Sequence, residues 1–331
     1  MWCWKRAISM PTPSRPIGLP LRLPVFPQEC AADYLVRLYQ MNGRPWQNFS
    51  SDFGLSPKAL HSRQDAIEVL AALVPDQAEQ VGRLTPDARP LHRHIEVAGE
   101  MLHESMWTTH GRRWCPQCWN EDIASSKLPV AAWSAHGRFW WNMTLISTCP
   151  THCKRLVSAC PQCDGKATWK GRGLLSCSSG HDLIPGDAGA VTESDTFCDR
   201  YILGRLGALP AIQIPLLDGA DLATAIHTMG HLGAAKVLGP TEHWRRPDKM
   251  AEILSAGCRI AMDWPHAFED LVTKLAKADR SYHRSGATAL GALYDWICHL
   301  PEAALGESLM SVMFPILRRS GIWIERQFAA R

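Results

Sequence analysis

The chain has 331 residues, of which 46% are hydrophobic and 20% are charged, and its formal net charge is +3. This composition indicates an ordinary globular protein that is long enough for two or three domains. No run of about 18 apolar residues is present, so we expect no membrane-spanning helix.

Residues 1–20 are rich in proline and hold basic residues, but they lack the apolar segment of a secretory signal. We expect a disordered extension here, with translation starting at Met1 or at Met10. Without an export signal the protein is expected in the cytoplasm, where thiols stay reduced. Clustered cysteines in such a protein indicate metal ligands or catalytic groups rather than disulfides.

Residues 31–84 carry the pattern of four short helices joined by tight turns. On the first of them, Tyr34, Leu35 and Leu38 share one face with Tyr39 or Met41. This arrangement is compatible with a helix-turn-helix unit, although a small helical bundle gives the same pattern.

Two helix starts are predicted later in this region. Ser56 is the expected N-cap of a helix whose first residue is Pro57. Asp76 and Glu79 have the spacing of a capping box.

The pattern changes between residues 109 and 187, where cysteine, tryptophan, glycine and basic residues become frequent. Residues 130–147, "VAAWSAHGRFWWNMTLIS", form the one run of helical length, and we expect its tryptophans to pack in the core. The histidine-rich stretch before this region, around His94, is predicted as a solvated helix or loop.

Helical periodicity returns after Val191. One helix is predicted from Asp221 to Gly239, two more on either side of Trp264-Pro265, and two in the last fifty residues. The predicted fold is therefore mostly α with small zinc-ribbon β elements. Its expected parts are a disordered extension (1–20), an N-terminal helix-turn-helix-like bundle (21–108), a tandem zinc-binding module (109–187) and a C-terminal helical domain (188–331).

Eight of the twelve cysteines lie between Cys115 and Cys198, and most belong to pairs at a fixed spacing. Two residues between ligands suit a tight turn that directs both side chains at one ion, and zinc takes four thiolate or imidazole ligands. Paired in chain order, these residues form two Cys3-His sites: Cys115, Cys118, Cys149 and His152, then Cys160, Cys163, Cys177 and His181.

These sites predict two structural zinc ions, because four protein ligands leave no position for a catalytic water. Cys153 competes with His152 for the fourth position of the first site. The other cysteines, such as Cys30 and Cys258, are expected to be buried apolar residues.

The positive charge is concentrated in this same region. Residues 110–175 hold nine Lys or Arg and three acidic residues, a net charge of +6, so the rest of the chain sums to −3. Such an excess suits a nucleic-acid partner and would supply phosphate contacts that do not depend on sequence, although a solvated basic face explains it equally well. The candidate residues are Arg112, Arg113, Lys154 and Arg155.

The order of these motifs resembles the TniQ/TnsD family, the target-site selectors of bacterial transposons. The resemblance is carried by "LPVFPQECAADYLVRLYQMNG", "RWCPQCWNED", "WWNMTLISTCPTHCKRLVSACPQC" and "CSSGHDL". It implies a non-catalytic accessory protein that binds DNA or an RNA-guided CRISPR effector complex and recruits an AAA+ ATPase, which brings in the transposase. The family's helix-turn-helix maps onto residues 31–84, where Lys58, His61, Arg63 and Gln64 become candidate DNA contacts.

Two other functional classes remain open on the sequence. A zinc-ribbon transcription regulator would bind an operator and recruit no transposase. A zinc hydrolase or nuclease would need a metal with an open coordination position, and no nucleotide-binding or nucleophile motif points to an enzyme. The sequence does not fix the oligomeric state, so a homodimer stays open.

Overall fold

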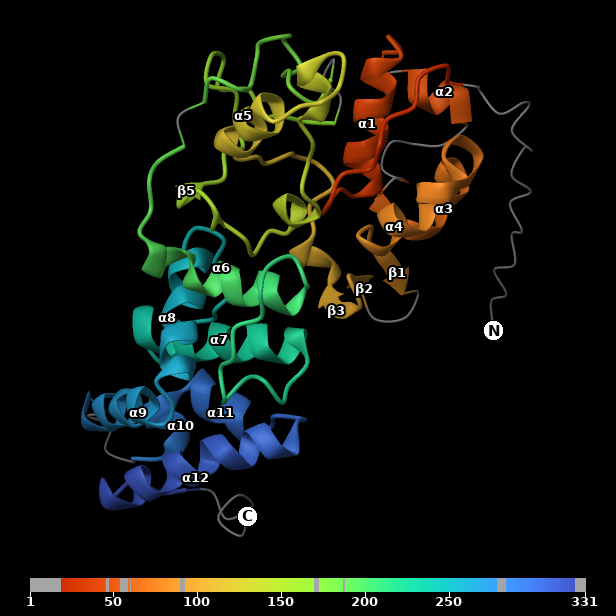
Figure 1. The fold of residues 1–331 in the computed structure, drawn as a ribbon. Coiled ribbons are helices and arrows are strands. Elements are labelled where there is room, and N and C mark those ends of the chain that lie inside the picture. Colours follow the sequence, from red (N-terminus) through yellow and green to blue (C-terminus); the bar gives the residue numbers. More distant parts are fainter. Residues whose placement is uncertain are drawn as a thin grey trace, which may run out of the picture. The chain divides into compact units, whose positions relative to one another are not determined.

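The computed structural model divides into two compact units (Figure 1), which are described separately. No helix in the described part of the chain is both long and apolar enough to cross a membrane. Unit 1 comprises residues 1–99, 104–144 and 155–189, and unit 2 comprises residues 100–103, 145–154 and 190–331. The structure describes residues 19–45, 48–53, 59, 61–89, 93–169, 173–186, 188–278 and 284–324.

Unit 1 begins with the four short helices predicted from the sequence. They are α1 (Ala31–Met41), α2 (Phe49–Phe53), α3 (Arg63–Leu73) and α4 (Ala78–Arg83), with a 3-10 turn at Pro75–Gln77 before α4. The predicted apolar face of α1 is confirmed, because Tyr34, Leu35, Leu38 and Tyr39 are all buried. This face packs against α3 and α4.

The start of α3 differs from the prediction. The helix begins at Arg63, with Ser62 in extended conformation before it, and the predicted start at Ser56 and Pro57 lies outside the described residues. The amide of Arg63 donates to the carbonyl of Pro86 at 2.6 Å. A tertiary partner therefore satisfies the first amide of the helix, where a side-chain cap was expected. The capping box predicted at Asp76 and Glu79 is also absent, since no side chain caps α4.

A small antiparallel sheet follows, where a solvated helix or loop was predicted. Its strands β1 (Asp87–Arg89), β2 (His94–Val97) and β3 (Glu100–His103) lie in sequential order. Ala88 of β1 pairs with Ile95 of β2, and Ile95 and Val97 are buried while their neighbours are not. Ala98 and Gly99 both have positive φ, which suits the two-residue turn between β2 and β3. The prediction failed because a four-residue alternation is too short to stand out.

Little regular structure occurs between residues 107 and 190. The helix is α5 (Pro116–Ala124), and the strands are β4 (Thr148–Cys149) and β5 (Lys154–Arg155). The helical run predicted over residues 130–147 is wrong, since only 3-10 turns form at Ala131–Ser134 and Phe139–Asn142. Tertiary contacts override the local pattern, because the amide of Phe139 donates to the carbonyl of Gln28 at 2.6 Å. Trp140 and Trp141 are buried, as predicted, whereas Trp133 is only half-buried.

Unit 2 is helical, and its best-defined predictions are confirmed. Asp221 caps α7 by accepting from the amide of Thr224 at 2.6 Å, and α8 and α9 lie on either side of Trp264-Pro265. Among the described residues of the last fifty, three helices form where two were expected. The bounds are α6 (Glu193–Arg205), α7 (Leu222–Val237), α8 (Met250–Met262), α9 (His266–Ala278), α10 (Gly286–Leu290), α11 (Ala292–Cys298) and α12 (Ala303–Arg319).

The crossing of α7 and α8 depends on two glycines. A Cβ atom on Gly233 would collide with the carbonyl oxygen of Ile253, and one on Gly257 would collide with that of Met229. Backbone atoms cannot move aside as a flexible side chain can, so a larger residue at either position must separate the helices.

We therefore expect Gly257→Ala to lower the free energy of unfolding by about 1–3 kcal/mol or more, the usual cost of overpacking a core. Gly219→Ala is the control, because a Cβ there meets nothing within 4 Å. Thermal and denaturant unfolding would compare the two. Equal midpoints for both variants would show that α7 and α8 are not this closely packed.

Candidate metal centres

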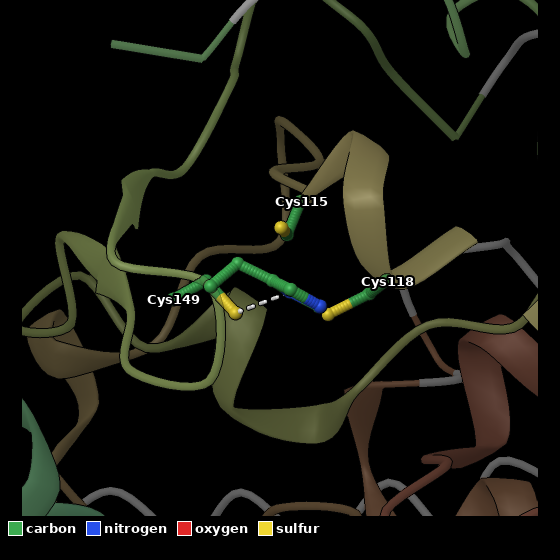
Figure 2. Close-up of side chains that lie close together, drawn as sticks. Cys115, Cys118 and Cys149 are labelled. Carbon is green, nitrogen blue, oxygen red and sulfur yellow. Dashed lines mark hydrogen bonds between the residues drawn. The ribbon is translucent and has the colours of Figure 1, made fainter. Parts of the chain in front are cut away.

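The first set of predicted ligands comes together in the structure. One donor atom each from Cys115, Cys118, Cys149 and His152 lies within 4.8 Å of the other three. Cys115 occupies the N-cap position of α5, and the first turn of that helix returns Cys118 to its side. Figure 2 shows the sulfur atoms of these two residues and Cys149 facing a common centre, and the Cys149 sulfur lies 3.4 Å from His152 Nδ1.

The second set also comes together, in loops of unit 1. The Sγ atoms of Cys163 and Cys177 are 3.9 Å apart, and Cys160 Sγ lies 3.9 Å from Nδ1 of His181. Two tight turns hold these ligands. The amide of Asp164 donates to the carbonyl of Cys160 at 2.9 Å, and the amide of Cys177 donates to the carbonyl of His181 at 3.0 Å.

Both sets fit a tetrahedral zinc ion. Metal–sulfur bonds of about 2.3 Å and metal–nitrogen bonds of about 2.0 Å require sulfur–sulfur edges of about 3.8 Å and sulfur–nitrogen edges of about 3.6 Å. Three of the separations in the structure are 3.4 to 3.9 Å, and all donor atoms of each set lie within 4.8 Å of one another. All the cysteines of both sets are free thiols rather than disulfides. Three sulfurs and one imidazole are the donor set of a structural zinc site.

The geometry also separates the two candidates for the fourth ligand of the first set. His152 belongs to that set, and Cys153 does not. Cys153 has a φ of 47°, and its carbonyl accepts from the amide of Val191 at 2.9 Å. Its role is thus to turn the chain after the ligand pair.

Hydrogen bonds lower the pKa of one thiol of the second set, that of Cys177. Burial alone raises the pKa of Cys177, but amide groups of His181 and Ser179 donate to its sulfur and, with its neighbouring thiols, lower the pKa to about 6. The His181 amide lies 3.3 Å from this sulfur. Cys177 is therefore mostly thiolate at neutral pH, the form that binds zinc.

Two of the basic residues predicted to contact DNA instead contact backbone carbonyls within the protein. Arg112 is buried, and its guanidinium donates to the carbonyls of Leu174 at 2.9 Å and Gly173 at 3.2 Å. Burial lowers the pKa of Arg112 to about 10. Arg113 likewise donates to the carbonyls of Trp141 and Met143. The assignment of Arg112 to DNA is thus corrected, because its side chain cannot reach a phosphate without leaving the core.

His61 and Arg63, on the predicted recognition helix, also make contacts within the protein. His61 is buried, accepts from Trp107 Nε1 at 3.3 Å, and has its pKa lowered by burial to about 4. Arg63 donates to the carbonyl of Gly82 at 3.0 Å and pairs with Glu96 at 3.2 Å. The assignment of His61 to DNA is therefore corrected as well.

The remaining predicted contacts are accessible or lie outside the described residues. Gln64 and Arg155 are exposed, Lys154 is half-buried, and Lys58 is not among the described residues. Arg138, another of the nine basic residues, pairs with Asp122 at 2.6 Å. Three of the nine basic residues, Arg112, Arg113 and Arg138, thus bind groups within the protein.

The TniQ family model matches residues 20–156 of this chain. The match contains the first ligand set and ends before the second. No curated protein matches the chain.

We expect two zinc ions per chain in protein purified without chelator, measured by elemental analysis. Cys115→Ser and Cys160→Ser should each lose one ion and loosen the irregular segment between residues 107 and 190, because apparent zinc binding contributes about 10–16 kcal/mol in zinc-finger peptides. Cys153→Ser is the matched control and should keep both ions. A wild-type protein with one ion or none, or fully protected amides in the ligand variants, would refute the structural role.

Proposed function

Residues 20–156 belong to the TniQ family, and on that basis we propose that this chain selects the target site of a transposon. The family assignment implies an accessory role in transposition. In the proposed role the chain binds the target, either as DNA or through an RNA-guided CRISPR effector complex. It then recruits an AAA+ ATPase, which brings in the transposase. In this role the protein would act in the cytoplasm, because the chromosome lies there.

The metal centres support a role without catalysis. Each ligand set supplies four protein donors within 4.8 Å of one another, close enough to bind one ion. A zinc ion held in this way has no coordination position for a water that could attack a substrate. We propose that both ions serve to order the irregular segment between residues 107 and 190, so that the hydrolase alternative finds no support in this geometry.

The proposal keeps a contact with DNA, but with fewer candidate residues. The accessible candidates are Gln64, in the first turn of α3, and the neighbouring Lys154 and Arg155 on β5. The two basic residues can supply phosphate contacts, and the amide of Gln64 can hydrogen-bond a base edge. Lys58 is retained as a candidate from the sequence alone.

A reconstitution experiment tests the recruitment step. The protein would be purified and combined with the AAA+ ATPase and the integrase-like transposase that the proposal expects in neighbouring genes, with co-elution as the measurement. The proposal predicts that the ATPase co-elutes with this chain and that the transposase joins through the ATPase. A chain that binds neither, but represses a promoter next to its own gene, would support the transcription-regulator alternative instead.

For DNA, we expect weak binding to duplex at roughly 10⁻⁴–10⁻⁶ M near physiological salt. Lys154→Ala combined with Arg155→Ala should reduce the slope of log affinity against log salt by about 1.8, because each lost phosphate contact removes about 0.9. Lys236→Ala combined with Lys249→Ala removes the same charge from exposed positions in unit 2 and is the control.

Two results would show whether these residues contact DNA or a protein partner. Gln64→Ala should change the preferred sequence and leave the salt slope unchanged. If the Lys154/Arg155 variant keeps its slope and affinity but no longer binds the ATPase, this surface binds protein and the DNA assignment is wrong.

A further inference from the structure

Unit 1 contains a surface pocket that neither metal centre uses. Its volume is about 320 Å³, the lower end of the range for ligand-binding pockets. The lining comes from the extended segment before α1, from the end of α5 and the loop after it, and from the loop before Phe139. Pro24, Phe26 and Leu128 supply its apolar surface, and Lys127, Ser134 and His136 supply polar atoms.

The pocket wall is held in place by contacts behind it. The ring of Phe26 stacks on that of His136, with centroids 4.6 Å apart. The guanidinium of Arg37 lies 4.6 Å from the centre of the Phe26 ring, and Arg37 itself is buried in an ion pair with Glu29 at 2.6 Å. The carbonyl of His136 accepts from Trp119 Nε1 at 3.0 Å. A preformed wall of this kind loses little side-chain entropy when something binds to it.

The loop next to the pocket exposes apolar residues in succession. Leu128 lines the pocket, Pro129, Ala131 and Ala132 are exposed, and Val130 keeps 42% of its surface exposed. Single exposed apolar residues are common, but an exposed run beside a pocket is typical of a surface that binds another protein.

The charged residues at the pocket indicate which charge a bound partner should carry. Asp122 is already neutralised, because Arg138 contacts its two oxygens at 2.6 and 2.8 Å and His136 Nδ1 lies 3.2 Å away. Burial by itself raises the pKa of Asp122, but these hydrogen bonds outweigh it and hold the pKa below its usual value. Lys127, in contrast, is exposed and forms no ion pair with any described residue.

We infer that this pocket docks a segment of a partner protein in which an apolar side chain is followed or preceded by a carboxylate. The apolar side chain enters the pocket against Phe26 and Leu128, its neighbours cover Val130, and the carboxylate pairs with Lys127. A nucleic acid fits less well, because Lys127 is the one unpaired Lys or Arg among the described lining residues, and a phosphate chain would leave the apolar rim in water. The inference goes beyond the proposed function, because it concerns a peptide-binding pocket. It can be tested without the ATPase or the transposase.

A displayed library of random seven-residue peptides, selected on the full-length zinc-loaded protein, tests this inference. We expect enrichment of peptides with Asp or Glu beside Leu, Phe or Trp. Val130→Asp should weaken the best synthetic peptide by about tenfold, and Lys127→Glu by about fivefold, since a rim charge contributes less than a buried apolar contact. Both changed side chains are exposed, so folding is preserved.

Lys127→Glu should also reverse the selection, so that Lys or Arg replaces the acidic residue beside the apolar one. Lys274→Glu, which makes the same charge change on an exposed residue of α9, should leave the selected peptides and their affinity unchanged. Three results would overturn the inference: no enrichment above background, enriched peptides without the acidic-apolar pattern, or peptides that bind both variants as tightly as the wild type.

Discussion

The two sets of four metal ligands are the constraint on which the irregular segment between residues 107 and 190 depends. Between residues 107 and 190, the described residues form one α-helix of nine residues, two 3-10 turns and two strands of two residues each. Single bridges such as the one between Trp114 and Val157 hold the loops together. Segments with so few backbone hydrogen bonds need another source of order, and two closed metal sites supply it. The accessible surface of this segment, including Lys154 and Arg155, is positioned by that closure.

A second set of contacts ties α1 to the irregular segment within unit 1. Gly137 approaches the carboxylate of Asp33 so closely that a Cβ would collide with it, and Asn142 donates to the same carboxylate at 3.4 Å. Burial raises the pKa of Asp33 to about 6. Arg37 reaches the carbonyl of Trp133 at 3.2 Å. The segment predicted as a helix is instead shaped around the polar groups of α1, which no local pattern reveals.

Several local features of the sequence predicted well, although the capping box at Asp76 and Glu79 did not form, and features that depend on distant partners were not predicted. The ligand sets were predictable because ligand spacing and turn geometry are properties of a few consecutive residues. The cap at Asp221 was predictable for the same reason. The role of Arg112 was not, because the carbonyls that it contacts, such as that of Leu174, lie about sixty residues further along the chain. Counting charges assumes that charged side chains are exposed, and for Arg112 and Arg138 that assumption fails.

The coordination itself is the most direct test of this account. X-ray absorption at the zinc edge on the purified protein reports the number and type of atoms bound to each ion. The account predicts an average of three sulfurs at about 2.3 Å and one nitrogen at about 2.0 Å, with no bound water. A shell dominated by oxygen and nitrogen, or one with about two sulfurs per zinc and an exchangeable water, would contradict the closed Cys3-His centres and reopen the case for a catalytic metal.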